Sequence, residues 1–308
     1  MAKSVKKQNL EKSLEQLHDL LERFPENSGA TRKDRRHHLS LAIKQLSDAG
    51  YKISDLNRLE HKHSDFLKRL WARENISAGT IKNRMCNLRW LAETLNIQKD
   101  GFGQKSNQEL QIPNRIYTDN SKNKAQKLDY EKLNRIDHPE LRLTLELCAE
   151  FGLRRKEALR FQIRHADQGD HLAIKDVWTK GGRPRVIPIT TQSQRDLLNR
   201  IWQYTKEHKM QSMIPVGTTY KQQKNKLQNE QYRVRIKNIH GLRHQYAQDR
   251  YKTLLGYDCP KVDKNTRKFN MTKEEIACEK AVRLLISEEL GHSRINITNA
   301  YLGSIYRI

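Results

Sequence analysis

Apolar residues recur at helical spacing along most of this chain, and this pattern restricts the fold to a mainly helical one. In the first hundred residues we expect four short amphipathic helices, the last beginning after Ser77, with the stripes Leu14/Leu17/Leu21, Leu39/Ile43/Leu46, Phe66/Leu67/Leu70/Trp71 and Ile81/Met85/Leu88/Leu91/Leu95. Helical spacing resumes at Leu128 and recurs towards the C-terminus, where Thr272 and Glu275 form a capping-box pattern.

The polar segment 98–125 interrupts this periodicity. It contains Gly and Pro and shows no sustained period, as an interdomain connection does. With 308 residues the chain is also long enough for two domains. We therefore expect a helical domain at 1–105, a linker at 106–125 and a second domain at 126–308.

One short stretch of the second domain has strand character. The segments 172–179 and 185–189 flank Gly181 and Gly182, a spacing that predicts a β-hairpin with a tight glycine connection. Lys180 stands where the first strand enters that turn. The expected fold class is therefore mainly α with a small antiparallel β-sheet.

The charge of the chain points to a nucleic acid as its partner. Lys and Arg number 59 against 36 Asp and Glu, which gives a formal charge of +23. A membrane surface, an acidic protein or a merely solvated surface remain alternatives on charge alone. The basic residues expected to contact DNA phosphates, unless they are only solvated, are Lys82, Arg84 and Arg89 on the fourth helix, and Arg183 and Arg185 beside the hairpin.

The cysteines and the apolar runs limit where the protein acts. Cys86, Cys148, Cys259 and Cys278 are scattered, without a CxxC pair or a His spacing that indicates a zinc site. No apolar run is as long as a membrane span, and the first residues lack the pattern of a signal peptide. We expect free thiols, no metal or cofactor, no membrane contact and a cytoplasmic protein.

Three segments carry the residues that metal-free cleavage of a DNA phosphodiester requires: a nucleophile, cations for the phosphate and an acid for the leaving oxygen. GLRRKEAL holds Arg154, with Glu157 one turn later to orient the guanidinium, and HGLRH places His240 and Arg243 on one helical face. LGHSRINITNAY adds His292 and, nine positions later, Tyr301. Each piece alone also fits a surface ion pair, a capping histidine or a structural histidine.

Taken together and in this order, Arg154, Lys180 in TKGGRPRVIPI, His240, Arg243, His292 and Tyr301 resemble the tyrosine recombinase (phage integrase) family. The resemblance covers 127–308. The first hundred residues resemble, through SAGTIKNRMCNLRWL, the helical core-binding (SAM-like) domain of that family. It implies two domains that close around double-stranded DNA like a clamp, the second of them catalytic.

The resemblance also implies a role for each residue. Arg154 and Arg243 grip the non-bridging oxygens while Tyr301 attacks phosphorus, which gives a 3′-phosphotyrosine and a free 5′-hydroxyl. Lys180 protonates the leaving 5′ oxygen. His240 and His292 hydrogen-bond the phosphate and assist proton movement, with His240 the expected partner of the tyrosine proton.

At the level of the assembly, the resemblance implies site-specific recombination through a Holliday junction, for integration or excision of a mobile element. A homotetramer forms on two DNA sites, the free protein is a monomer, and an accessory DNA-bending protein is a candidate partner. The chain departs from the family in a longer stretch at 251–275 and in the short tail LGSIYRI after Tyr301.

Rival interpretations remain open at this stage. Arg155 competes with Arg154, Arg183 and Arg185 compete with Lys180, and Tyr306 competes with Tyr301. For the function as a whole, the alternatives are type IB topoisomerase-like relaxation of DNA, a non-catalytic DNA-binding regulator and an RNA-binding protein. The last has no RNP-like aromatic strand or GxxG loop to support it.

Overall fold

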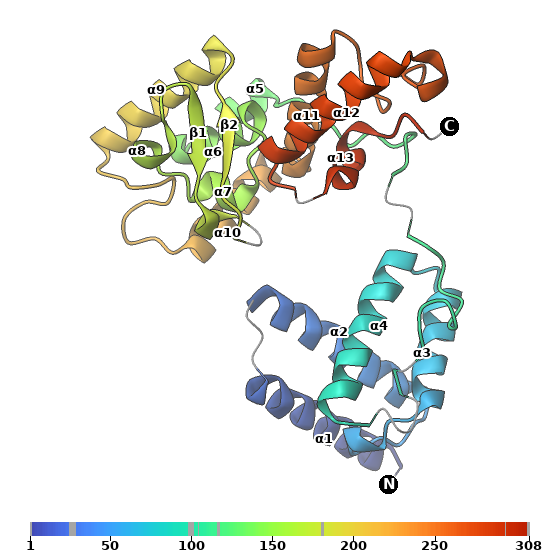
Figure 1. Cartoon of the computed structure of the whole chain (residues 1–308). Coiled ribbons are helices and arrows are strands. Elements are labelled where there is room, and N and C mark those ends of the chain that lie inside the picture. Colours follow the sequence, from blue (N-terminus) through green and yellow to red (C-terminus); the bar gives the residue numbers. More distant parts are fainter. Residues whose placement is uncertain are drawn as a thin grey trace. The chain divides into compact units, whose positions relative to one another are not determined.

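The computed structural model describes residues 2–24, 29–97, 102–103, 105–115, 118–179, 182–292 and 294–306. The chain divides into two compact units, Met1–Ile116 and Tyr117–Ile308, each with its own hydrophobic core (Figure 1). No helix in these described ranges is long and apolar enough to cross a membrane.

The first unit consists of helices, as its apolar stripes predict. Its elements are α1 (Ala2–Arg23), α2 (Gly29–Asp48), the 3₁₀ helix η1 (Leu56–Arg58), α3 (His61–Arg73) and α4 (Ala78–Thr94). Helix α4 begins after Ser77 because the Ser77 hydroxyl accepts a hydrogen bond from the Thr80 N–H at 3.3 Å. Trp71 is fully buried, and its indole N–H donates to Gln45 at 2.8 Å.

The described residues of the expected linker, 106–125, pack against the first unit before the division at residue 116 and against the second unit after it. Leu110 and Ile112 are buried in the core of the first unit. Beyond the division, Asn123 exchanges hydrogen bonds with Gln248, and Asn120 Nδ2 donates to the carbonyl of Ser304 at 3.0 Å. The part of this segment that the structure describes therefore belongs to one unit or the other.

The second unit is mainly helical with one small sheet (Figure 1). Its helices are α5 (Tyr130–Asn134), α6 (Pro139–Glu150), α7 (Arg155–Leu159), α8 (Ile163–Ala166), α9 (Gln192–Glu207), α10 (Tyr220–Arg233), α11 (Ile239–Leu255), α12 (Lys273–Glu289) and α13 (Ile295–Leu302), with the 3₁₀ helices η3 (Asp176–Trp178) and η4 (Lys268–Asn270). Helix α6 packs against α11 and α9, and α11, α12 and α13 pack against one another. This arrangement brings the start of α7, which follows Arg154, together with α11, which carries His240 and Arg243, and α13, which carries Tyr301.

The sheet is antiparallel, as predicted, but its first strand is shorter than expected. Strand β1 (His171–Ile174) pairs with β2 (Arg185–Pro188) in the register His171↔Pro188. The expected strand to residue 179 is wrong at its end, because η3 turns the chain and buries Trp178 against Phe161, at 6.2 Å between ring centroids. The predicted tight glycine connection is therefore a longer loop, and Lys180 and Gly181 in it lie outside the described residues.

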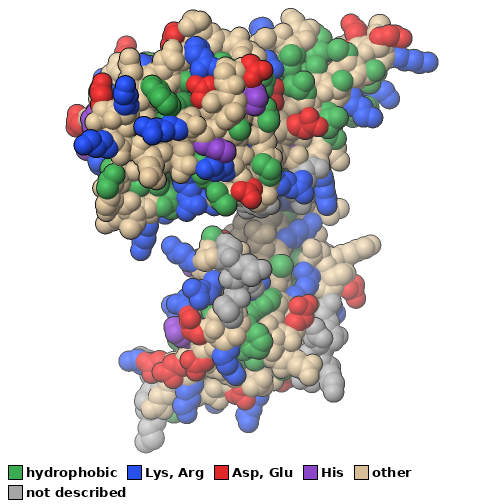
Figure 2. All heavy atoms as spheres, turned by 60° about the vertical axis from the view of Figure 1, so that its left-hand side comes forward, with side chains coloured by type: hydrophobic (Ala, Val, Ile, Leu, Met, Phe, Trp, Pro, Cys, Tyr) green, Lys and Arg blue, Asp and Glu red, His purple; other side chains and the backbone are tan. Residues whose placement is uncertain are grey.

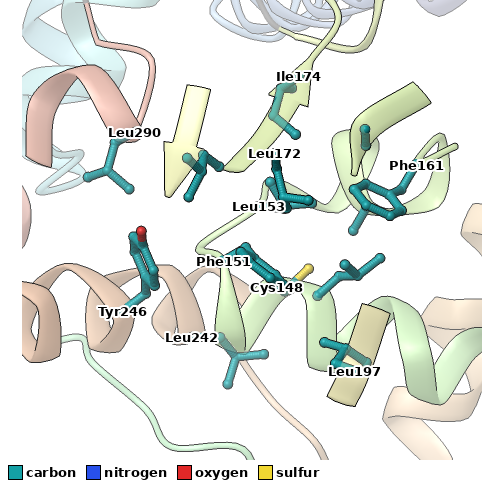
Figure 3. Packing of buried hydrophobic residues seen from close by; sticks show 14 of the residues in the cluster. Cys148, Phe151, Leu153, Phe161, Leu172, Ile174, Leu197, Leu242, Tyr246 and Leu290 are labelled. Carbon is teal, nitrogen blue, oxygen red and sulfur yellow. The ribbon is translucent and has the colours of Figure 1, made fainter. Parts of the chain in front are cut away.

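The core of the second unit is formed by side chains from its helices and its sheet. Figure 3 shows Phe151, Leu153 and Leu172 near the centre of this cluster, with Leu242 of α11 and Leu197 of α9 on its lower side. Apolar burial of this kind contributes about 1.5–3 kcal/mol for each large side chain. The same core carries the turn after α6 and the start of α7, and so fixes the backbone that presents Arg154.

Candidate active site

The predicted catalytic residues that the structure describes lie together in the second unit. Arg154 caps the start of α7, His240 and Arg243 lie on one face of α11, His292 follows α12, and Tyr301 lies on α13. Lys180 lies outside the described residues.

The two arginines converge on one backbone carbonyl. Arg154 Nη2 donates to the Leu290 carbonyl at 3.2 Å, and Arg243 Nη2 donates to the same oxygen. Arg243 Nη1 also donates to the carbonyl of Gly152, in the turn between α6 and α7. Backbone groups from two distant turns therefore hold both guanidinium groups in place.

Arg243 is a buried cation with an unsatisfied donor. Its side chain is 1% exposed, and within the described chain its Nε has no hydrogen-bond partner. Burial, followed by the like charge of Arg154, lowers the pKa of Arg243 to about 10. It remains charged at neutral pH, and a buried charge with an unpaired N–H is unfavourable until an anion approaches.

Glu157 connects the arginines of the site through one buried carboxylate. Its oxygens accept from Arg154 Nη1 at 2.8 Å, from the Arg154 backbone N–H at 2.7 Å, and from Arg185 at 3.1 and 2.7 Å. Burial alone would raise the pKa of Glu157. This effect is outweighed by the hydrogen bonds and charge of Arg185 and then by the charges of Arg154 and Arg243, which hold the pKa at about 2. The predicted role of Glu157 in orienting Arg154 agrees with this geometry.

Arg185 corrects one prediction. We expected it to contact DNA from the hairpin, but its side chain is only 3% exposed and is paired with Glu157. Its Nε also donates to the Glu289 carbonyl at 2.8 Å. All three guanidinium nitrogens of Arg185 donate within the protein, two of them to a carboxylate that balances its charge, so Arg185 is a supporting residue of the site.

Tyr301 lies among three imidazoles. Its hydroxyl is 3.3 Å from His240 Nε2, and its ring centroid lies 5.2 Å from that of His292 and 4.3 Å from that of His244. The guanidinium carbon of Arg243 is 5.8 Å from the centroid of the same ring. The phenol is therefore positioned beside both a proton acceptor and a cation.

The histidines of the site are held in their neutral form. The pKa of His240 is lowered, first by partial burial and then by the charges of Arg243 and Arg154. This holds although the residue is exposed to solvent overall. The same causes lower the pKa of His292 to about 3. A neutral His240 in the Nδ1–H tautomer has a lone pair on Nε2 for the phenol proton.

The inserted stretch and the C-terminal tail fix the helix that carries Tyr301. The backbone N–H groups of Lys261 and Lys268 donate to the carbonyls of Leu302 and Ile305, at 3.1 and 3.0 Å. Arg283 Nη1 donates to the Gly303 carbonyl at 2.8 Å. The described part of the short tail is therefore bound within its own chain, and the insertion is one of the elements that hold it.

The rival residues lie in different surroundings. Tyr306 is 66% exposed, with its ring 5.4 Å from the Lys268 ammonium, whereas Tyr301 lies beside His240. Arg155 lines an open groove, whereas Arg154 donates to the Leu290 carbonyl. The geometry thus favours Tyr301 and Arg154 over their neighbours.

The predicted DNA-contacting residues of α4 differ in how they are held. Arg84 has two buried nitrogens without a hydrogen-bond partner among the described residues, and its guanidinium lies 5.2 Å from the Trp71 ring. Arg89 instead donates to the Lys105 carbonyl and the Asn107 side chain at 2.8 and 3.0 Å. The Arg84 guanidinium therefore packs within the protein beside Trp71, while Arg89 helps to hold the segment after α4.

The two other residues predicted to bind DNA remain near the surface. The Lys82 ammonium lies 3.4 Å from Asn114 Oδ1, in an exposed contact. Arg183 is exposed beside the sheet. Lys and Arg side chains are spread over the face of both units that Figure 2 shows.

A basic groove next to the site was missed in the sequence. It measures about 1120 Å³, extends from Arg154 and His240, and is also lined by Arg155, Lys156, Tyr232, Arg235 and Lys237. Tyr232 is 89% exposed. The signal that marks Arg235 and Lys237 is the alternation of cations and apolar residues in RVRIKNI, directly before His240.

Comparison with known proteins connects both units to one family. A family model described as phage integrase, N-terminal, matches residues 10–97, and one described as integrase matches residues 115–249. The chain belongs to the tyrosine recombinase (phage integrase) family. Its function class is therefore site-specific DNA recombination, its first unit is the core-binding domain and its second the catalytic domain. The matched range ends before His292 and Tyr301.

Solved structures share the fold of this recombinase. A lambda integrase dimer bound to a core site is 12% identical, with a TM-score of 0.56 and coverage of 94% of this chain and 95% of that one. The Tn1549 transposon integrase in complex with transposon right end DNA is 13% identical, with a TM-score of 0.51 and coverage of 94% of each chain. A search among curated proteins found no match.

Proposed function

We propose that this protein cleaves and rejoins DNA at specific sites through a covalent 3′-phosphotyrosine at Tyr301. The observation that carries the proposal is the 3.3 Å contact between the Tyr301 hydroxyl and His240 Nε2, beside two arginines that converge on the Leu290 carbonyl. A nucleophile, a proton acceptor and two cations are what attack on a phosphodiester requires.

Cleavage proceeds as an exchange of one ester for another. Arg154 and Arg243 donate to the non-bridging oxygens and stabilise the charge that develops on them. Tyr301 Oη attacks phosphorus, its proton passes to His240 Nε2, and the bond to the 5′ oxygen breaks. We assign the proton that this oxygen gains to Lys180, and His292 to a hydrogen bond with the phosphate. Attack by a 5′-hydroxyl on the phosphotyrosine reverses the step and rejoins the strand.

The active site acts within one chain, because Tyr301 lies beside His240 and Arg243 of the same chain. Mixing Tyr301→Phe protein with Arg243→Ala protein should therefore produce no cleavage, measured as covalent adduct on denaturing gels. Cleavage by the mixture would mean that the tyrosine is supplied by a partner. Wild-type protein diluted with Tyr301→Phe protein provides the control for assembly on DNA.

The groove and the basic surface give the DNA a path to this site. The +23 charge and the cations of the groove, including Arg155, Arg235 and Lys237, support binding of the sugar–phosphate backbone. Because duplexes at two sites present four strands to be cut, the proposal includes a tetramer on DNA, a Holliday junction between the two rounds of exchange, and a monomer in the absence of DNA. An accessory DNA-bending protein remains a candidate partner.

We further propose that the substrate is a mobile element, integrated or excised in the cytoplasm. Support comes from relatives of the same fold, one bound to a core site and one to transposon right end DNA. Relaxation of plasmids that carry no recombination site would instead indicate topoisomerase-like activity.

The test begins by finding DNA that the protein recognises. Tyr301→Phe protein selects duplexes from a random library without cutting them, and the selected duplex is then nicked close to the protected centre so that cleavage releases a short fragment. Wild-type protein with this duplex and chelator should form an SDS-resistant adduct, and Tyr301→Phe should form none. Selective binding without any adduct from the wild type would overturn the proposal in favour of a DNA-binding regulator.

A further inference from the structure

His244 is an imidazole of the site to which the sequence pattern assigns no role. It lies on α11 one turn after His240, and its side chain is 4% exposed. Its ring lies nearly flat on that of Tyr301, at 4.3 Å between centroids with an interplanar angle of 30°. By contrast, the His240 ring meets the phenol ring at 61° and 5.7 Å.

Hydrogen bonding does not explain why this histidine lies here. Its Nδ1 is buried without a partner among the described residues. Burial, followed by the neighbouring His240 and Lys261, lowers the pKa of His244 to about 3, so the ring is neutral at the pH of the reaction. An imidazole that is neither charged nor hydrogen-bonded at this nitrogen offers Tyr301 mainly its flat surface.

The reaction requires the phenol plane to be fixed. His240 Nε2 lies 3.3 Å from the phenol oxygen, and Gln248 Nε2 donates to the Tyr301 backbone carbonyl at 3.0 Å, but neither hydrogen bond fixes the terminal torsion of the side chain, which is broad for an aromatic ring. Rotation about this torsion leaves the oxygen in place but turns its in-plane lone pair, and attack depends on the direction of that lone pair as well as on distance. Of the imidazoles around this ring, His244 lies closest, at 4.3 Å between centroids, against 5.2 Å for His292 and 5.7 Å for His240.

We propose that His244 is a positioning residue for the nucleophile, which fixes the plane of the Tyr301 ring by face-to-face packing and with it the direction of the in-plane lone pair on Oη. This inference rests on the proposed function, because it assumes that Tyr301 is the attacking group. His244 contacts Tyr301 and no reacting atom, so its effect belongs to the cleavage step and not to DNA binding.

The test compares three side chains at this position on the nicked, selected duplex, under single turnover with saturating protein. His244→Phe keeps a flat ring without nitrogen, and His244→Leu fills similar space without a flat face. We expect cleavage by the Phe variant within about 3-fold of wild type and by the Leu variant at least about 10-fold slower, since misorientation of a reacting group carries costs of this size. DNA affinity should be unchanged in both.

Two outcomes would overturn the inference. Equal rates for Leu and Phe would mean that only filled volume matters, and a Phe variant as slow as Leu would mean that an imidazole nitrogen moves a proton. The pH profile of cleavage separates the last case further, because the Phe variant should keep the wild-type acid limb. Gln245→Ala, the neighbouring position on α11, is the matched control and should cleave like wild type.

Failure of this inference is distinguishable from failure of the proposed function. If wild-type protein forms no adduct on DNA that it binds selectively, the assignment of Tyr301 fails first. If wild-type protein forms the adduct and Tyr301→Phe does not, equal cleavage by wild type and His244→Leu rejects only the role of His244. Thermal melting of each variant shows that folded proteins are compared.

Discussion

Replacement of Glu157 by glutamine tests how the arginines of the site are held. The Glu157 carboxylate accepts four hydrogen bonds from Arg154 and Arg185, and both its own side chain and that of Arg185 are almost fully buried. Glutamine keeps the shape but presents an amide N–H₂ to arginine N–H groups. It therefore loses acceptors and leaves the Arg185 charge unpaired.

The expected cost follows from the pKa of the carboxyl group. A shift of the pKa from its ordinary value of 4.5 to about 2 corresponds to about 3 kcal/mol of stability from the ionised form. Because the folded-state pKa is lowered, this contribution is present above pH 4.5 and is lost as the pH falls through about 2. Glu157→Gln should therefore lower the free energy of unfolding of the second unit by about 3 kcal/mol between pH 5 and pH 7.

Native-state hydrogen exchange of the full chain measures this change in one unit at a time. Amides of α6 and α11 should exchange about 100-fold faster in Glu157→Gln, whereas amides of α2 and α4 should be unchanged and provide an internal control. Glu131→Gln, an exposed acid on α5, should have little effect. An acceleration below about 10-fold in α6 and α11 would refute the conclusion that Glu157 holds the buried arginines.

Three further predictions concern the turn, the proton acceptor and the groove. Gly152→Ala should lower the free energy of unfolding by at least about 2 kcal/mol in urea denaturation, because Gly152 has φ +58° and an added Cβ would lie 2.6 Å from the Tyr246 ring. The rate of wild-type cleavage should fall as the pH is lowered, with a midpoint below pH 6.5. The reason is that His240 must be neutral to accept the proton, and the pKa of His240 is lowered. His240→Gln should lose this limb, and a midpoint above 6.5 would contradict the assignment. Arg235→Gln with Lys237→Gln should weaken DNA binding and reduce the slope of log affinity against log salt by about 2, as two lost phosphate contacts require; an unchanged slope would remove the groove from the DNA path.

The helices and the order of the chemical groups follow from the sequence. Helical spacing and caps act between residues a few positions apart, so Ser77 and Thr272 mark helix starts where the structure has them. In α12, apolar spacing predicts burial of the face that carries Ala277, Ala281, Leu284 and Leu285, and this prediction is wrong. That face is exposed, and the buried face carries Glu279 and Arg283, which pair with each other.

The sequence by itself determined that the chain is helical, basic and equipped with the residues of one chemistry in one order. Only the tertiary structure decided that Arg185 supports Glu157 instead of binding DNA, and that His244 packs on Tyr301. These contacts join residues 28 and 57 positions apart, since folding brings separate elements onto one core. Arg183 and Arg185 belong to the same hairpin and have the same side-chain chemistry. Only the burial of Arg185 beside the Glu157 carboxylate distinguishes its role from that of the exposed Arg183.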